Sequence, residues 1–239
     1  MHESPLPLPP LPARDPRGHK GTFGTVVVFG GCTGPDRHMM GAPALSARAA
    51  LRAGAGLARL VMPGPILDAG IALCPSATGI PMPVDGDGQT VPHEVSRVFD
   101  EQLAACDCLV VGPGLGSGKG PAALALRAVV QEDAPVVIDA DALNALAQFP
   151  ELVRDFHAAA IPTPPPGESR RLAEGRGRHG APVDPASRPA AAMALAQRLG
   201  CIVVLKGSGT VVSDGQRTWV DDRGSGSAEI AADKGTGGL

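Results

Sequence analysis

The stretch "TVVVFGG", residues 25–31, is a short run of β-branched and aromatic side chains that ends in two glycines. Such an unbroken apolar run is typical of a strand that is buried on both faces. The glycines indicate a turn at its carboxyl end. An alanine-rich segment, residues 42–56, follows with helical composition and ends at Gly54 or Gly56. Together the two segments predict the first strand and the first helix of an α/β sheet.

The same alternation recurs along the chain. Further apolar runs predict strands at residues 57–63, 107–114, 134–141, 158–164 and 200–207. Helical segments are expected at residues 92–105, 119–131, 141–148, 167–174 and 186–199. Strand–helix–strand units of this spacing predict a mostly parallel central sheet with helices on both faces. Residues 210–221 predict a hairpin that turns at Asp214-Gly215, at the edge or the carboxyl end of that sheet.

Length and charge restrict the class of protein. A chain of 239 residues can bury one large α/β core, and we expect a proline-rich arm at residues 1–18 before a single domain at residues 19–239. The net charge of −3 is spread along the chain, which argues against nucleic acid as a partner. The sequence has neither a signal peptide nor an apolar run of ~18 residues, so we expect a cytoplasmic protein that does not enter a membrane.

The cysteines and histidines do not form a metal-binding pattern. The five cysteines are an odd number and lie mostly in apolar surroundings, so we expect reduced structural thiols. The six histidines are far apart in the sequence, which argues against a zinc site.

Ligands of a parallel α/β sheet bind at the carboxyl ends of the strands. One candidate there is the glycine-rich turn "GPGLGSG", residues 112–118, whose N–H groups can face an anion at the start of a helix. The alternative is a plain strand-to-helix turn. Spacing alone does not distinguish the two.

Carboxylates and a lysine follow the later strands. Asp139 and Asp141 can hold Mg²⁺ through water or orient a phosphate-bearing ligand; alternatively, Asp141 caps the next helix and Asp139 binds backbone amides. Lys206, at the end of a strand, suits a nucleotide phosphate, and its alternative is a solvated lysine. Glu168 lies at a helix N-terminus, where the helix dipole alone would favour it.

Six ordered motifs together resemble the ADP- or ATP-dependent NAD(P)H-hydrate dehydratases, repair enzymes of ribokinase-like fold. The motifs are "HKGTFG" (19–24), "GG…GAPALSARAALRAGAGL" (30–57), "VVGPGLG" (110–116), "VIDADALNALA" (137–147), "TPPPGE" (163–168) and "LKGSGT" (205–210). The resemblance implies the reaction: the 6-hydroxyl of hydrated NADH or NADPH is phosphorylated by ADP or ATP, and phosphate then leaves to restore the nicotinamide. It also implies that the protein forms a homo-oligomer.

The resemblance also implies residue roles. Ala42, Gly114 and Gly116 would contact the hydrated nicotinamide, and Asp139, Asp141 and Glu168 would organise Mg²⁺ and the phosphate end. The nucleotide would be held by Lys206, Gly207, Ser208, Gly209, Thr210 and Gly237.

Two positions depart from the family pattern. Pro165 stands where the family has a substrate-contacting histidine, and Gly238 replaces the aspartate of its "GTGD" motif, the general base on the hydroxyl. The family helix that follows this motif is also missing, so we expect a C-terminal truncation and impaired activity. Two alternatives stay open: a ribokinase-like kinase for a small alcohol such as a vitamin precursor, and a non-catalytic nucleotide-binding homologue.

Overall fold

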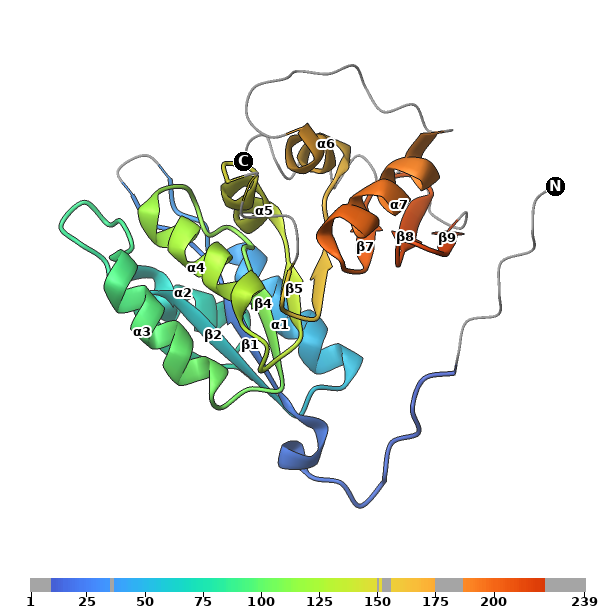
Figure 1. Cartoon of the computed structure of the whole chain (residues 1–239). Helices are drawn as coiled ribbons and strands as arrows, with labels where there is room; N and C mark the ends of the chain where they lie inside the picture. The colour runs from blue at the N-terminus through green and yellow to red at the C-terminus, as the bar shows by residue number, and fades with distance from the viewer. Residues whose placement is uncertain (1–9, 35–36, 150, 152–155, 175–186, 222–239) are drawn as a thin grey trace.

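Six parallel strands form the central sheet of the computed structural model, in the order β3-β2-β1-β4-β5-β6 (Figure 1). The strands are β1 (Thr25–Phe29), β2 (Leu57–Pro63), β3 (Thr78–Met82), β4 (Cys108–Val111), β5 (Val136–Ile138) and β6 (Ala160–Pro162). The structure describes residues 10–34, 37–149, 151, 156–174 and 187–221. The predicted mostly parallel α/β sheet is therefore confirmed.

Helices cover both faces of this sheet (Figure 1). They are η1 (Lys20–Phe23), α1 (Gly41–Ala53), α2 (Gly64–Leu73), α3 (Pro92–Leu103), α4 (Lys119–Val130), α5 (Ala140–Leu146), α6 (Pro166–Glu174) and α7 (Arg188–Leu199).

Alternation along β1 divides the core in two. Val28 packs in one apolar cluster with residues of α1 and α2, whereas Val27 and Phe29 belong to a second cluster that includes residues of α3, α4 and α5. Successive side chains of a strand face opposite sides, so a strand that is apolar at every position needs a helix layer on each face.

Residues 64–82 hold two elements that the sequence reasoning missed, helix α2 and strand β3. Their sequences contain residues that usually interrupt such elements: Pro65 in the first turn of α2, and Gly79 and Pro81 in β3. Proline is tolerated at the start of a helix and on an edge strand. Because β3 lies at the edge of the sheet, its proline costs no central hydrogen bond.

A second, three-stranded antiparallel sheet contains β7 (Val203–Leu205), β8 (Thr210–Ser213) and β9 (Thr218–Asp221). The strand expected within residues 200–207 is present, but its expected place in the parallel sheet is wrong, because β7 pairs antiparallel with β8. An apolar run does not encode the direction of its partner. The two sheets are connected where the Lys206 N–H donates to the Pro164 carbonyl at 2.9 Å.

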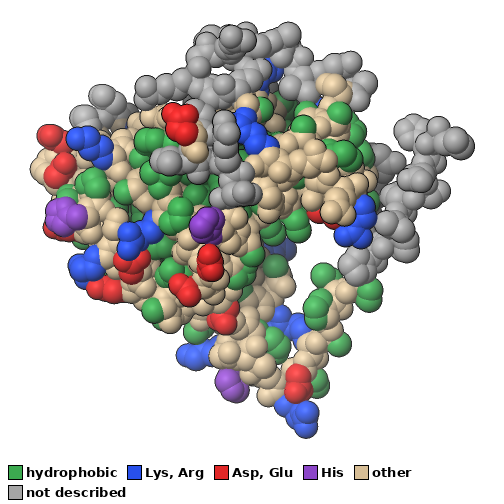
Figure 2. Space-filling model, viewed as in Figure 1, with side chains coloured by type: hydrophobic (Ala, Val, Ile, Leu, Met, Phe, Trp, Pro, Cys, Tyr) green, Lys and Arg blue, Asp and Glu red, His purple; other side chains and the backbone are tan. Residues whose placement is uncertain are grey.

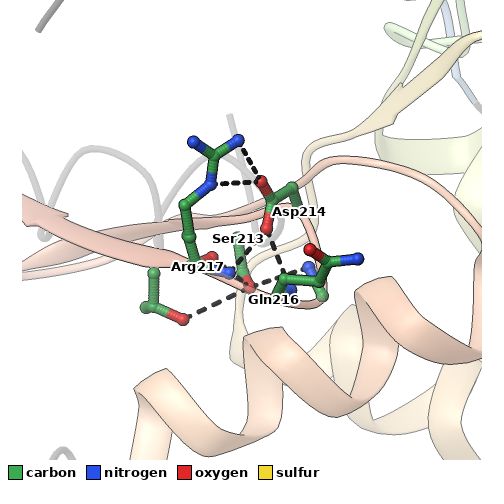
Figure 3. A network of polar contacts seen from close by, with 6 residues as sticks. Ser213, Asp214, Gln216 and Arg217 are labelled. Carbon is green, nitrogen blue, oxygen red and sulfur yellow. Dashed lines mark hydrogen bonds and ion pairs between the residues drawn. The ribbon is translucent and has the colours of Figure 1, made fainter.

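The predicted hairpin between β8 and β9 is confirmed, and Asp214 organises its turn (Figure 3). The Asp214 carboxylate accepts the backbone N–H groups of Gln216 and Arg217 at 2.9 and 2.6 Å and the Arg217 guanidinium at 2.9 Å. Backbone hydrogen bonds from Arg217 and Gln216, followed by the Arg217 side chain, lower the pKa of Asp214 to about 2. An aspartate that bonds its own turn in this way is a common device for fixing a hairpin.

The described part of the proline-rich arm, residues 10–18, is attached to the domain through Arg14. Its guanidinium lies 3.8 Å from the centre of the Phe23 ring and donates to the Gly54 carbonyl at 2.7 Å. Cation–π contact and hydrogen bond together hold this segment beside η1 and the end of α1. The division into an arm and a single domain stays a prediction.

The free cysteines agree with the expectation of reduced thiols. Acidic and basic side chains are interspersed on the face shown in Figure 2. All five cysteines are free thiols, and burial raises the pKa of Cys201 to about 12. Within the described residues, no helix is both long and apolar enough to span a bilayer.

Candidate functional site

The glycine-rich turn after β4 packs directly against the start of α5. Gly112 has φ +124°, and a Cβ at this position would overlap the carbonyl oxygen of Asp139. Only glycine combines this backbone conformation with so close an approach. The turn "GPGLGSG" and the "DAD" segment are therefore held together at the carboxyl edge of neighbouring strands β4 and β5.

Gly116 joins the same two segments through a hydrogen bond. Its N–H donates to Asp141 Oδ2 at 2.8 Å, and a Cβ at Gly116 would lie 2.9 Å from that of Cys32. The alternative in which Asp141 caps its own helix is wrong, since this carboxylate bonds the turn after β4. Asp141, which was predicted on the phosphate side, thus positions Gly116, which was predicted on the substrate side.

Asp139 lies at the N-cap position of α5 but makes no capping bond with its side chain. Its Oδ1 instead accepts the Thr163 hydroxyl at 2.7 Å and the Lys206 ammonium at 2.6 Å. The alternatives of an amide-binding Asp139 and a solvated Lys206 are therefore both wrong. The side chains of Lys206 and Asp139 are 35% and 26% exposed, so water screens this ion pair only partly.

Ala140, between the two aspartates, has φ 46° and is the only non-glycine residue in the described part of the chain with positive φ. Such a conformation costs on the order of 1–3 kcal/mol and persists only where the surroundings impose it. Here Asp139 bonds Lys206 on one side while Asp141 bonds Gly116 on the other. The strained residue therefore lies between two carboxylates that bind different segments of the chain.

Glu168 is a buried carboxyl group beside this pair. The residue is 3% exposed, and its Oε2 has no hydrogen-bond partner among the described residues. Burial, followed by the negative charge of Asp139, raises the pKa of Glu168 to about 7, although Lys206 and Arg171 oppose the rise. The reading of Glu168 as a residue placed only to favour the helix dipole does not account for a buried oxygen without a partner.

We expect Glu168→Gln to change how stability depends on pH. A carboxyl group with a pKa of about 7 in the folded chain binds more protons between pH ~4.3 and 7 than it does unfolded. Its stabilising contribution is therefore complete below pH ~4.3 and is lost as the pH rises through about 7. Glutamine does not titrate, so the variant gains on the order of 1–3 kcal/mol relative to wild type between pH 5 and 8.

Urea denaturation of both proteins at pH 5 and pH 8 measures this difference. Glu151→Gln is the matched control, because Glu151 is exposed. A stability difference between wild type and Glu168→Gln that stays constant with pH would contradict the raised pKa.

The three carboxylates do not form a direct metal site. In the described part of the chain, no group of three His, Cys, Asp or Glu residues has metal-ligand spacing. Asp139 Oδ1 is occupied by an ammonium and a hydroxyl, and Asp141 Oδ2 by an amide. An indirect role of Asp139, Asp141 and Glu168 toward Mg²⁺ stays a prediction.

The predicted substrate-side residues lie in three places: Ala42 in the first turn of α1, Gly114 in the turn after β4, and Pro165 between β6 and α6. Gly114 has φ +63°, and a Cβ there would meet the side chains of Met39 and Pro43 at 3.1 and 3.8 Å. Pro43 follows Ala42 in the first turn of α1, so Ala42 and Gly114 belong to one contact region. Pro165 contributes its carbonyl, which accepts the Ser169 N–H at 3.0 Å.

An open pocket of about 270 Å³ adjoins Gly116. Its wall includes Cys32, Arg37, Gln89, Thr90 and Ser117. Its lining is polar and apolar in equal parts, and it lies beside the start of α4.

Two further residues of the site were missed from sequence. Thr163 lies within the "TPPPGE" motif, but its bond to Asp139 could not be read from the motif. Arg188, at the start of α7, is buried and donates to carbonyls at the end of β7 and in the segment after it. A cation at a helix N-terminus interacts unfavourably with the helix dipole. The place of Arg188 in the first turn of α7 was therefore the available signal that it binds another segment. Gly237 and Gly238 lie outside the described residues.

The fold and the glycine-rich carboxyl edge define a ribokinase-like α/β protein. The structure is similar to that of ADP/ATP-dependent NAD(P)H-hydrate dehydratase from Bacillus subtilis co-crystallised with ATP/Mg²⁺, with TM-score 0.64 and 26% identity over 92% of this chain and 73% of that one. It is also similar to a ribokinase-like superfamily protein from Enterococcus faecalis, with TM-score 0.63 and 21% identity over 87% and 66% of the two chains.

Similarity to other sequences identifies the family. The family model described as NAD(P)H-hydrate dehydratase matches residues 26–237. The bifunctional NAD(P)H-hydrate repair enzyme Nnr of Salinibacter ruber is 37% identical over 84% of this chain, and the ADP-dependent (S)-NAD(P)H-hydrate dehydratase of Xanthomonas campestris is 34% identical over 85%. The chain belongs to the NAD(P)H-hydrate dehydratase family. The match spans 36% of the Salinibacter protein and 65% of the Xanthomonas protein.

Proposed function

We propose that this chain is an ADP- or ATP-dependent (S)-NAD(P)H-hydrate dehydratase, a hydro-lyase that repairs hydrated NADH and NADPH. The observation that carries the proposal is the ion pair between Lys206 and Asp139, at 2.6 Å. It joins the "LKGSGT" segment, which suits nucleotide phosphates, to the carboxylates and glycines at the ends of β4 and β5. One continuous set of contacts therefore extends from the proposed nucleotide loop to the proposed substrate side.

In this proposal the nucleotide donates a phosphoryl group to the 6-hydroxyl of the hydrated ring, and phosphate then leaves. Lys206 neutralises charge on the phosphates, and the ion pair with Asp139 limits the positions that its ammonium can take. Gly114 and Gly116, with positive φ, let the ring approach the backbone closely. Pro165 cannot replace the contacts of a histidine, so substrate affinity depends more on this backbone.

The names of the relatives support the choice of ADP or ATP as the nucleotide. The Xanthomonas relative is named ADP-dependent, and the Bacillus structure was obtained with ATP/Mg²⁺. We infer that either nucleotide serves this chain and that Mg²⁺ arrives with the phosphates, since Mg²⁺ usually binds one or two carboxylates together with phosphate oxygens.

The assembly and location are also proposals. Leu45 of α1 and Leu73 of α2 are 63% and 47% exposed, which supports a homo-oligomer that covers them. We place it in the cytoplasm, where nucleotide co-substrates are found.

The test is an assay with hydrated NADH and either ADP or ATP. The proposal expects the absorbance of reduced nicotinamide to return only when both are present. Small alcohols such as vitamin precursors serve as the comparison, with nucleotide consumption as the readout. Consumption with an alcohol and no return of nicotinamide absorbance would favour the kinase instead.

A second candidate function, non-catalytic nucleotide binding, is favoured by Gly238 in place of an aspartate base. It expects ADP to raise the melting temperature while no turnover occurs. A general base contributes ~10²–10⁴-fold in rate, so Gly238→Asp together with Pro165→His is expected to restore activity of that order. Failure of that chain to turn over substrate would count against the dehydratase.

A further inference from the structure

Arg188 is a buried cation without an acidic partner among the described residues. The residue is 6% exposed, and no carboxylate of the described part of the chain lies within ion-pair distance of its guanidinium. A buried charge is costly unless its surroundings compensate for it. Among the described residues, the compensation comes from backbone carbonyls.

Those carbonyls belong to the last residue of β7 and to the segment that follows it. Arg188 Nη2 donates to the carbonyls of Lys206 at 2.8 Å and Leu205 at 3.2 Å, and Nη1 donates to the carbonyl of Ser208. One planar guanidinium thereby fixes three peptide groups in four consecutive residues. The fork geometry of arginine allows this, and the single ammonium of a lysine does not.

The contact sets the direction of the N–H groups in this segment. In a trans peptide the C=O and the following N–H point in opposite directions. The carbonyl of Leu205 faces Arg188, and the N–H of Lys206 accordingly points away from it, to the carbonyl of Pro164 at 2.9 Å. By the same geometry, the N–H groups of Gly207 and Gly209 face away from Arg188. Neither donates to a backbone group of the described residues.

Gly207 is the residue that permits this arrangement. Its φ is +137°, and a Cβ there would lie 2.7 Å from Arg188 Nη2. Any side chain would therefore push the guanidinium from the carbonyls. The glycine and the arginine act as one structural unit.

We propose that Arg188 is the positioning residue for the nucleotide phosphates, holding the Lys206–Thr210 segment so that the amides of Gly207 and Gly209 face the anion. The inference rests on the proposed function for its ligand. Two amides directed to one side, beside the Lys206 ammonium, make an anion-binding concavity. The positive charge of Arg188, which is paired with no carboxylate of the described residues, strengthens the positive potential from behind it.

The test is a titration of the full chain with ADP and, separately, with adenosine, which lacks phosphates. In Arg188→Met we expect ADP affinity to fall about tenfold to a hundredfold, while adenosine affinity changes less than about twofold. Arg188→Lys keeps the charge but loses the fork, and we expect it to lie between wild type and Arg188→Met. It also provides the test if the methionine variant does not fold.

Arg198→Met is the matched control. Arg198 lies on the same helix and also donates to a backbone carbonyl, that of Ala173, but does not contact the segment after β7. It should leave both affinities unchanged. ADP affinity within about twofold of wild type in both Arg188 variants, or equal loss of ADP and adenosine, would overturn the inference. A wild-type chain that binds no ADP would overturn the proposed function itself, and that titration comes first.

Discussion

Lys206→Met is expected to weaken ADP binding by about a hundredfold while the chain stays folded. Methionine has similar length, so the packing of the aliphatic stem is kept. The ammonium, however, is lost from both of its proposed tasks. The phosphates lose a cation, and Asp139 keeps only the Thr163 hydroxyl on Oδ1. The unpaired carboxylate then repels the anionic nucleotide as well.

Isothermal titration of the variant with ADP measures this loss. Lys20→Met is the matched control, because Lys20 is exposed on η1, before the amino end of β1, and far in the sequence from the proposed nucleotide segment. We expect the control to bind as wild type does. Equal ADP affinity for Lys206→Met and Lys20→Met would show that Lys206 does not hold the phosphates.

Gly112→Ala is expected to lower the free energy of unfolding by roughly 3–5 kcal/mol, a large part of the stability of a typical domain. The new Cβ would overlap the Asp139 carbonyl oxygen, which belongs to the backbone and cannot rotate away. The residue also has φ +124°, a conformation that alanine rarely adopts. Relief of both strains requires that β4 and α5 move apart.

Urea denaturation followed by circular dichroism measures the effect. Gly86→Ala is the control, since a Cβ at Gly86 would meet nothing within 4 Å and its φ is not in the left-handed region. We expect this control to stay within about 0.5 kcal/mol of wild type. Similar denaturation midpoints for the two variants would mean that the turn after β4 can relax at little cost.

Most of the central sheet could be predicted from sequence because its signal is local. Apolar runs such as the one at residues 25–31 predict buried strands, and glycines predict the turns after them. Elements with mixed signals were missed: β3 carries Gly79 and Pro81 and is a strand only because β2 offers it an edge. The strand at 203–205 was found, but its antiparallel pairing was not.

The candidate site shows the same division. Its positions could be located from sequence, because the carboxyl ends of parallel strands converge on one edge. The hydrogen-bond and ion-pair partners of these residues could not be predicted from sequence. Asp141 bonds Gly116 across 25 positions of the sequence, and Asp139 bonds Lys206 across 67. Arg188 gave only the weak signal of a cation at a helix start.

The sequence by itself determined the α/β class, the mostly parallel central sheet, and the glycine- and carboxylate-rich edge, because each depends on side chains close together in the chain. Only the tertiary structure decided which carboxylate meets which donor, and that Arg188 supports the Lys206–Thr210 segment. Those contacts join residues far apart in sequence. They form only after the two sheets and their helices have packed and the carboxyl ends of separate strands lie close together.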